Sequence, residues 1–329
     1  MQELLVVKNL KKHFPLQTGF LDNLLTRQKQ VVRAVDDVSF YIQKGEVLGL
    51  AGESGCGKTT TGRLILRLLE PTAGEVDYQG RSIFDYGTEE MRQMREKLQI
   101  IFQDPNASLS PRMSVGYAIS HPLIIHNLYQ NPTERKERTL EMMEKVGLNP
   151  AQFFYRKYPH QISGGQRQRA VIARALIMNP ELVVADEPIA MADVSVRATL
   201  LELMVYLKEE FDLTYLFITH DLATAKYICN RIAIMYLGKI VEMGPYHAVF
   251  SEALHPYTKA LLAAVPVPDP QFRRKEPIPK DEIPDAINPP SGCRFHPRCS
   301  YRLKRCSEEE PALKDHGNNH FAACWLYDS

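Results

Sequence analysis

The chain has 329 residues, a length that suits two domains or one large domain with an appendage. Of these residues 44% are hydrophobic and 24% are charged, which is ordinary for a soluble globular protein. Its 40 lysines and arginines against 39 aspartates and glutamates leave a net charge of +1, which gives no electrostatic reason to expect nucleic acid as a partner. No apolar run approaches the roughly 18–20 residues that span a bilayer, and the first residues lack the pattern of a secretory signal, so any membrane role is expected to depend on partner subunits.

Apolar runs alternate with helical patterns along most of the chain, and this alternation predicts an α/β fold. Glu46–Ala51 is a predicted strand that enters a glycine-rich loop, and Thr59–Leu69 is the helix predicted after that loop. Further along, three short apolar runs have the length and composition of buried parallel strands. These runs are Leu98–Phe102, Leu182–Ala185 and Thr214–Ile218.

Strand patterns fade between residues 104 and 162, where a helical subdomain is expected. Within this stretch, Thr133–Val146 has a helical pattern that Gly147 and Pro150 bring to an end.

The last third of the chain changes in character. A hairpin is predicted over Ile232–Glu242, with its turn at Leu237 and Gly238. Eight of the 22 prolines then fall between Pro266 and Pro290. Because proline fixes φ and restricts the residue before it, this stretch is predicted to be an extended linker, which a cysteine-rich tail follows.

The glycine-rich loop after the first predicted strand fits the phosphate-binding pattern G-x-x-x-x-G-K-[ST] in full. Glycines let the backbone curl so that its N–H groups point at phosphate oxygens, and the helix N-terminus adds a positive partial charge. Lys58 is expected to reach the β- and γ-phosphates of ATP, and the Thr59 hydroxyl is expected to ligate Mg²⁺. The predicted nucleotide-binding residues of this segment are Gly52, Glu53, Ser54, Gly55, Cys56, Gly57, Lys58, Thr59 and Thr60.

Two acids follow the apolar run Leu182–Ala185. At the carboxyl edge of a parallel sheet, Asp186 is expected in the Mg²⁺ shell and Glu187 is expected to act as general base for the attacking water. About 20 residues earlier, a Ser-Gly-Gly-Gln sequence opens a predicted helix, which is a second arrangement suited to phosphate. Its residues are Ser163, Gly164, Gly165 and Gln166, and they are predicted to contact ATP.

Along the chain, the glycine-rich loop is followed by the Ser-Gly-Gly-Gln sequence and then by the Asp-Glu pair. With these three motifs, the sequence resembles the ABC ATPase family. The resemblance implies roles for four residues that would otherwise be taken as structural. Gln103 matches the Q-loop glutamine that senses the γ-phosphate and Mg²⁺, and His220 matches the switch histidine, so both join Glu187 as predicted catalytic residues. Asp193 matches the D-loop aspartate, and Phe14 matches the aromatic residue that stacks on adenine. The predicted Mg²⁺ ligands are Thr59, Gln103 and Asp186.

The sequence is still more similar to one subfamily, the ATP-binding subunits of oligopeptide and dipeptide ABC importers. The stretches that carry this similarity are Phe102–Pro105, Ser108–Arg112, Tyr158–Arg169, His255–Thr258 and the tail from Pro289 to Cys324. The resemblance implies a two-lobed domain that pairs head to tail, with ATP between the Lys58 loop of one subunit and the Ser163 motif of the other. It also implies a second, homologous ATPase subunit, with a heterodimer favoured over a homodimer, two transmembrane permease subunits and an extracytoplasmic solute-binding protein. The complex is then expected at the cytoplasmic face of the inner membrane, with this chain peripheral.

One departure from the family pattern falls in the D-loop, where Ala190, Met191 and Ala192 precede Asp193 in place of Ser-Ala-Leu. The missing serine hydroxyl would be able to bond across the dimer. Its loss fits two unequal ATP sites and fits a neutral substitution equally well.

Four of the six cysteines lie in the last 37 residues. In a chain without a secretory signal, such a group suggests metal binding before it suggests disulfides. The paired spacing of zinc sites is absent, and four thiolates at looser spacing can hold an iron–sulfur cluster. The subfamily resemblance implies a [4Fe–4S] cluster, while a structural zinc site and four ordinary cysteines are the alternatives. The cysteines are Cys293, Cys299, Cys306 and Cys324.

The sequence therefore predicts an α/β P-loop NTPase of the ABC type, with antiparallel β and helical subdomains, that binds ATP and Mg²⁺ and powers peptide import. The nucleotide-binding domain is expected at residues 1–255, with its helical subdomain at about 104–165, and the cysteine-bearing extension at 256–329. An importer of oligosaccharides or nickel is the first alternative. A soluble ABC ATPase of DNA repair or translation would usually have a long coiled coil or two cassettes, and a metal-sensing regulator would not need the complete set of ATPase motifs.

Overall fold

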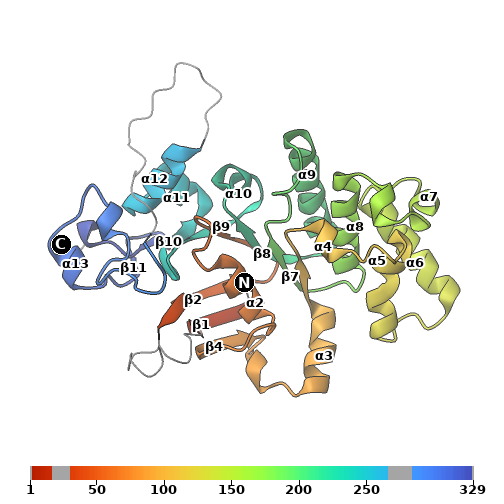
Figure 1. Cartoon of the computed structure of the whole chain (residues 1–329), viewed down its shortest axis with the longest axis horizontal. Helices are drawn as coiled ribbons and strands as arrows, with labels where there is room; N and C mark the ends of the chain where they lie inside the picture. Colours follow the sequence, from red (N-terminus) through yellow and green to blue (C-terminus); the bar gives the residue numbers. More distant parts are fainter. Residues whose placement is uncertain (1, 17–29, 266–283, 328–329) are drawn as a thin grey trace. The chain divides into compact units, whose positions relative to one another are not determined.

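The computed structural model describes residues 2–16, 30–265 and 284–327 (Figure 1). Most of the predicted proline-rich linker, residues 266–283, lies outside these ranges. The chain divides into two compact units, each built from segments that are distant in sequence. The first unit contains Met1–Gln2, Ile42–Val47 and Asp85–Ile218, and the second contains Glu3–Tyr41, Leu48–Phe84 and Thr219–Ser329.

The first unit contains three parallel strands, β6 (Leu98–Ile101), β7 (Leu182–Asp186) and β8 (Thr214–Thr219), paired in the order β6-β7-β8. Every side chain of β7 and β8 is buried. Continuous burial explains why these strands are unbroken apolar runs, since a parallel strand that is covered on both faces has no polar side. All three predicted strands are confirmed, each to within one residue.

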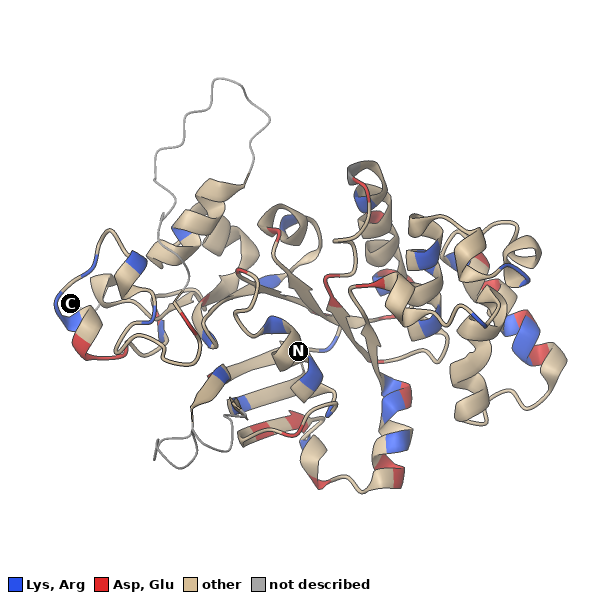
Figure 2. Ribbon diagram, viewed as in Figure 1, with Lys and Arg blue, Asp and Glu red and all other residues tan. Residues whose placement is uncertain are grey.

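Helices make up most of the rest of this unit. Helix α5 packs against α6, α7 and α8 (Figure 1). The α6 helix begins where the Asn131 side chain accepts the Thr133 N–H and ends before Gly147, whose φ is 76°, close to the predicted bounds. Acidic and basic side chains mix along α3 and α6, in keeping with the small net charge (Figure 2). The helices are α3 (Thr88–Lys97), α4 (Pro105–Ser108), α5 (Val115–Ile125), α6 (Pro132–Lys145), α7 (Ala151–Tyr155), α8 (Gly164–Leu176) and α9 (Val194–Glu210).

The second unit contains an antiparallel arrangement of four strands in the order β2-β1-β4-β5. Strands β1 and β4 pair with Leu5 opposite Tyr78, and both of these side chains are buried. The strands are β1 (Glu3–Pro15), β2 (Val31–Gln43), β4 (Ala73–Tyr78) and β5 (Arg81–Ser82).

Further strands of this unit pair in the order β11-β12-β10-β9-β3. Strand β3 is parallel to β9, whereas the hairpin β9–β10 and the short strands after it are antiparallel. The hairpin turns at Leu237 and Gly238, with φ of 42° and 83°, which is the geometry of a type I′ turn and confirms the predicted hairpin. The strands are β3 (Val47–Ala51), β9 (Arg231–Tyr236), β10 (Lys239–Pro245), β11 (Lys314–Asp315) and β12 (Phe321–Ala322).

Helix α2 covers Lys58–Ile65, so the prediction of a helix that continues to Leu69 is wrong at its end. Arg67 adopts a left-handed φ of 47°, and the Leu68 N–H then bonds to the Arg63 oxygen at 2.8 Å. This closure stops the helix without a glycine, and for that reason the sequence did not reveal it. The other helices of the unit are α10 (Leu222–Ile228), α11 (Tyr246–Ser251), α12 (Pro256–Ala264) and α13 (Arg305–Glu308). Within the described parts of the chain, no helix is long and apolar enough to cross a membrane.

Candidate functional site

The phosphate loop, residues Gly52–Thr59, joins the buried strand β3 to helix α2 in the second unit. Two of its glycines are required by close approaches of the backbone. A Cβ on Gly52 would lie 2.1 Å from the Met235 oxygen, and a Cβ on Gly57 would lie 2.1 Å from the Ala34 oxygen. Gly57 also has a left-handed φ of 111°, directly before the first residue of α2. The loop is thus pressed against neighbouring backbone in a shape that only glycine permits.

Lys58 is buried, and its ammonium group lies within the curl of this loop. The Lys58 Nζ donates to the Gly52 oxygen at 2.7 Å and to the Glu53 oxygen at 2.9 Å. Burial raises the pKa of the Cys56 thiol, so Cys56 serves as a neutral packing group. A cavity of about 260 Å³ lies beside the loop, with Glu53 to Cys56 on one side and Pro284–Ala286 on another.

Glu53 of the loop contacts two segments that are distant in sequence. Its backbone N–H donates to the Tyr257 hydroxyl at 2.9 Å. Its carboxylate accepts two hydrogen bonds from Arg298, at 2.9 and 3.1 Å, and these bonds raise the pKa of the guanidinium above its ordinary value. The sequence motif identified Glu53, but nothing in the sequence pointed to Tyr257 or Arg298 as its partners.

The predicted acid pair ends strand β7 in the first unit. Asp186 is buried, and Glu187 follows with a left-handed φ of 47°, an uncommon conformation for a residue other than glycine. The Glu187 N–H bonds to the Ile218 oxygen at 3.0 Å, and its carboxylate accepts a hydrogen bond from the Gln103 side chain at 3.1 Å. Two residues that were predicted from separate motifs therefore meet at the carboxyl ends of β6 and β7.

The Ser-Gly-Gly-Gln motif forms the N-terminus of helix α8, also in the first unit. The Ser163 hydroxyl accepts the Gln166 N–H at 3.3 Å, and the Ser163 N–H donates to the Gln166 side chain at 2.9 Å. This reciprocal pair is a capping box, which fixes the start of the helix. Ser163 and Gly164 are exposed, so this helix end is accessible to a ligand.

The D-loop leads into helix α9 with Asp193 as its N-cap residue. Arg197, which no sequence motif singled out, holds this loop from one turn further along. Its guanidinium donates to the Ala192 oxygen at 2.9 Å and to the Ala190 oxygen at 3.3 Å. These bonds go to backbone oxygens and are therefore independent of the serine that the D-loop lacks.

Two predicted site residues of the second unit lie apart from the phosphate-loop contacts described above. His220 is exposed between β8 and α10, where Asp221 caps the helix by accepting the Ala223 N–H at 2.9 Å. Phe14 is half-buried near the end of β1, with the Lys12 ammonium 5.1 Å from the centre of its ring.

The cysteine lobe, residues Pro289–Tyr327, gathers the four predicted cysteines as free thiols. Burial raises the pKa of Cys293 to about 12 and of Cys324 to about 11, and each thiol is further affected by the charges of the others. Each sulfur also accepts a backbone N–H, as in the bond from Leu303 to the Cys306 Sγ at 3.4 Å. Such donors suit thiolate ligands. Nevertheless, no group of three or more His, Cys, Asp or Glu side chains is arranged to hold a metal ion anywhere in the described ranges, so the arrangement does not support the predicted cluster.

Comparisons with known proteins agree with this combination of loop, strands and lobe. The family model for ABC transporters matches residues 35–190. The model for the C-terminal region of oligopeptide/dipeptide transporters matches residues 241–306, which include three of the four tail cysteines.

Curated relatives match along nearly the whole chain. The oligopeptide transport ATP-binding protein AppF of Bacillus subtilis is 45% identical, covering 99% of this chain and 98% of its own. The dipeptide transport ATP-binding protein DppF of Haemophilus influenzae is 46% identical, covering 97% of this chain and 95% of its own. The Escherichia coli DppF is 43% identical, covering 99% of this chain and 95% of its own.

Solved structures match the cassette portion. The dimeric ATP-binding cassette MJ0796, bound to ADP and Pi after hydrolysis, has a TM-score of 0.63 and 30% identity, covering 74% of this chain and 98% of that chain. CbiO1 from Clostridium perfringens, part of an ABC transporter complex, has a TM-score of 0.64 and 26% identity, covering 77% of this chain and 92% of that chain. The parallel strands, the phosphate loop and these likenesses define an ATP-binding cassette. More particularly, the chain belongs to the ABC transporter family of oligopeptide and dipeptide transport ATP-binding proteins.

Proposed function

We propose that this chain hydrolyses ATP to power the import of oligopeptides or dipeptides through partner permeases. Its family supports this role, and the contact between Gln103 and Glu187 is the observation that carries the chemistry. In the proposed step, water attacks the γ-phosphorus, Glu187 accepts the water's proton, and the bond from the γ-phosphorus to the ADP oxygen breaks. Gln103 positions the carboxylate of Glu187 for this transfer.

The nucleotide is held by the phosphate loop, with Lys58 on the β- and γ-phosphates. Thr59, Asp186 and Gln103 would hold Mg²⁺, and their oxygen donors match its preference for hard ligands. Phe14 stacks on adenine, and His220 contacts the γ-phosphate. The exposed N-terminus of α8, with Ser163 to Gln166, contacts the ATP of an opposing subunit, where the helix dipole favours the phosphate charge.

The opposing subunit is a second, homologous ATPase, and the pair is a heterodimer. The D-loop without its serine at Ala190 is compatible with two unequal sites and equally with a neutral substitution. The pair docks to two transmembrane permeases through the surface at Gln103–Arg112, at the cytoplasmic face of the membrane, and a solute-binding protein supplies the peptide. The nucleotide-binding domain covers residues 1–255, with its helical subdomain at about 104–165, and the extension covers residues 256–329.

The test uses the complex of this chain, its permeases and the second ATPase, reconstituted in vesicles with the solute-binding protein. Glu187→Gln is expected to bind ATP normally and to lower its turnover by about 10²- to 10⁴-fold, because an amide cannot accept the proton. Hydrolysis at the normal rate would refute the general-base assignment. Transport of oligosaccharide or nickel in place of peptide would refute the solute, and full transport with two copies of this chain alone would replace the heterodimer with a homodimer.

The finer proposal for the cysteine lobe is a [4Fe–4S] cluster on Cys293, Cys299, Cys306 and Cys324. The proposal starts from the gathering of four thiols in one lobe, each with a backbone N–H donor, even though the described side chains do not form a metal-binding group. Anaerobically purified protein is expected to be brown and to hold about four irons per chain. A colourless preparation with one zinc would instead identify a structural zinc site, and a metal-free preparation would identify four ordinary cysteines.

A further inference from the structure

The segment between the first two lobe cysteines contacts the phosphate loop directly. We call Cys293–Cys299 the arginine segment. Arg298, near its end, is buried and makes a bidentate pair with Glu53, with its Nη1 and Nη2 at 2.9 and 3.1 Å from the two carboxylate oxygens. The Arg298 Nη1 also lies 3.4 Å from the Tyr236 hydroxyl. A planar guanidinium bound in this way has a fixed direction as well as a fixed position.

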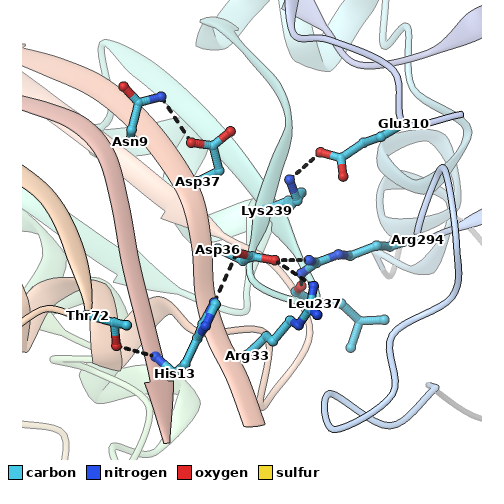
Figure 3. Close-up of polar contacts among 10 residues, drawn as sticks. All are labelled: Asn9, His13, Arg33, Asp36, Asp37, Thr72, Leu237, Lys239, Arg294 and Glu310. Atoms are coloured by element: carbon cyan, nitrogen blue, oxygen red, sulfur yellow. Dashed lines mark hydrogen bonds and ion pairs between the residues drawn. The ribbon is translucent and has the colours of Figure 1, made fainter. Parts of the chain in front are cut away.

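The arginine segment has two further anchors. Phe295 is 2% exposed and packs against Tyr236 and Tyr257, with ring centres 5.3 and 5.4 Å apart. Arg294 donates to the Asp36 carboxylate and to the Leu237 oxygen, and Figure 3 shows it reaching both groups from the C-terminal segment.

Asp36 connects this anchor to the predicted adenine-binding strand. Its carboxylate also lies 3.0 Å from the His13 Nε2, and His13 is the neighbour of Phe14 in β1 (Figure 3). The arginine segment therefore contacts the phosphate loop directly and is connected to the end of β1 through Asp36.

Glu53 poses an electrostatic difficulty that Arg298 resolves. The phosphate loop binds an anion, yet Glu53 places a carboxylate on that loop, and its backbone oxygen accepts a hydrogen bond from Lys58 at 2.9 Å. A negative charge on a loop that holds a triphosphate would oppose its binding, most strongly where water is partly excluded. The Glu53 side chain is only 28% exposed, so solvent screens its charge incompletely.

We propose that Arg298 is a positioning residue for ATP: it neutralises Glu53 and holds the phosphate loop in its binding shape. The inference depends on the proposed role of the loop in binding ATP, and it adds that the cysteine lobe sets nucleotide affinity. In this proposal Arg298 acts on the phosphates through its pair with Glu53. Removing the Glu53 charge should therefore compensate for the loss of Arg298, which a general loss of structure in the lobe would not allow.

The experiment measures the dissociation constant of a fluorescent ATP analogue for the full chain. Arg298→Ala is expected to weaken binding about five- to tenfold, in the usual range for coupled sites, and Arg298→Lys is expected to weaken it less. The double variant Arg298→Ala with Glu53→Gln is expected to regain most of the lost affinity. Lys304→Ala is the matched control, because this lobe residue has a side chain 92% exposed and should leave affinity unchanged.

Three outcomes would overturn the proposal: unchanged affinity in Arg298→Ala, no recovery in the double variant, or an equal loss in Lys304→Ala. If Arg298→Ala does not fold, Arg298→Lys with and without Glu53→Gln decides the question in the same way. Lys58→Ala, measured in parallel, separates the proposed ATP binding by the phosphate loop from the proposed role of Arg298. If Lys58→Ala binds the ATP analogue normally, the phosphate site itself is refuted. If Lys58→Ala loses binding while Arg298→Ala binds normally, only the role of Arg298 is refuted.

Discussion

The phosphate loop and the cysteine lobe belong to the same unit, but different kinds of contact hold them. Within the loop, Lys58 reaches oxygens only six and five residues before it, and Glu53 is the loop residue that bonds to the distant Tyr257 and Arg298. The lobe depends on ion pairs across long stretches of sequence, from Arg294 to Asp36 and from Arg298 to Glu53, which are 258 and 245 residues apart. Its own secondary structure includes a four-residue helix and two-residue strands.

This difference indicates how the two regions should respond to substitution. Replacing Lys58, whose bonds stay within the loop, should remove ligand contacts without unfolding the chain. A lobe with little regular structure should lose stability when one buried pair is broken, because few backbone hydrogen bonds remain to hold it. Three substitutions test this contrast.

The largest effect is expected from Lys58→Ala. The ammonium group is proposed to make charge-assisted bonds to two phosphates, so ATP affinity should fall about a thousandfold. The melting temperature should change little, since the bonds that Lys58 makes within the protein go to two carbonyls of its own loop. Calorimetric titration with MgATP and a thermal melt would measure both quantities. A large loss of stability would show that the loop is not locally determined.

Asp36→Ala should affect stability more than binding. It leaves the buried Arg294 without its carboxylate partner, and breaking such a pair typically costs about 3 kcal/mol in the free energy of unfolding. The only tryptophan, Trp325, lies in the lobe, so its fluorescence during urea denaturation reports on this region. Asp77→Ala is the control, because its partner Lys8 is 55% exposed and solvent screens the pair, which should therefore contribute little to stability. Equal losses in the two variants would contradict the contrast.

The smallest effect is expected from His255→Asn, which tests the helix that carries Tyr257. Burial lowers the pKa of His255 from 6.5 to about 4, against the opposing charge of Glu242. Between these values the unfolded chain binds more protons than the folded chain, so stability is full above pH 6.5 and falls as the pH drops towards 4. Asparagine keeps an acceptor for the Tyr257 N–H but does not titrate. Between pH 7 and pH 5, the free energy of unfolding should therefore fall by about 1–2 kcal/mol less in the variant than in the wild type. Identical pH profiles of this free energy, measured by urea denaturation, would refute the lowered pKa of His255.

The sequence predicted the parts of the fold in which neighbouring residues cooperate. Strands β7 and β8 are apolar throughout because both faces are buried, so composition alone located them. The phosphate loop was evident because its glycines, lysine and threonine are consecutive. The end of α2 was not, since Arg67 stops that helix by adopting a conformation that its residue type does not signal.

The contacts between distant residues could not be predicted in the same way. The sequence singled out Gln103 and Glu187, yet their bond depends on the pairing of β6 with β7 and on the left-handed backbone at Glu187. Arg298 is one of several basic residues in the tail, and its buried pair with Glu53 distinguishes it from exposed neighbours such as Lys304. Side chains whose role depends on tertiary packing leave no local pattern.

The burial of Phe295 has a practical consequence for anyone who shortens this protein to its cassette. A truncated chain that ends before the cysteine lobe would uncover Tyr236 and Tyr257, two of the largest fully buried side chains. The newly wetted aromatic patch would adjoin a sheet edge, since β10 would lose its partner β12. Bare hydrophobic surface beside an unpaired strand favours self-association. Such a fragment should aggregate as it is expressed, and grafting polar residues onto the exposed patch would be the way to recover it in monomeric form.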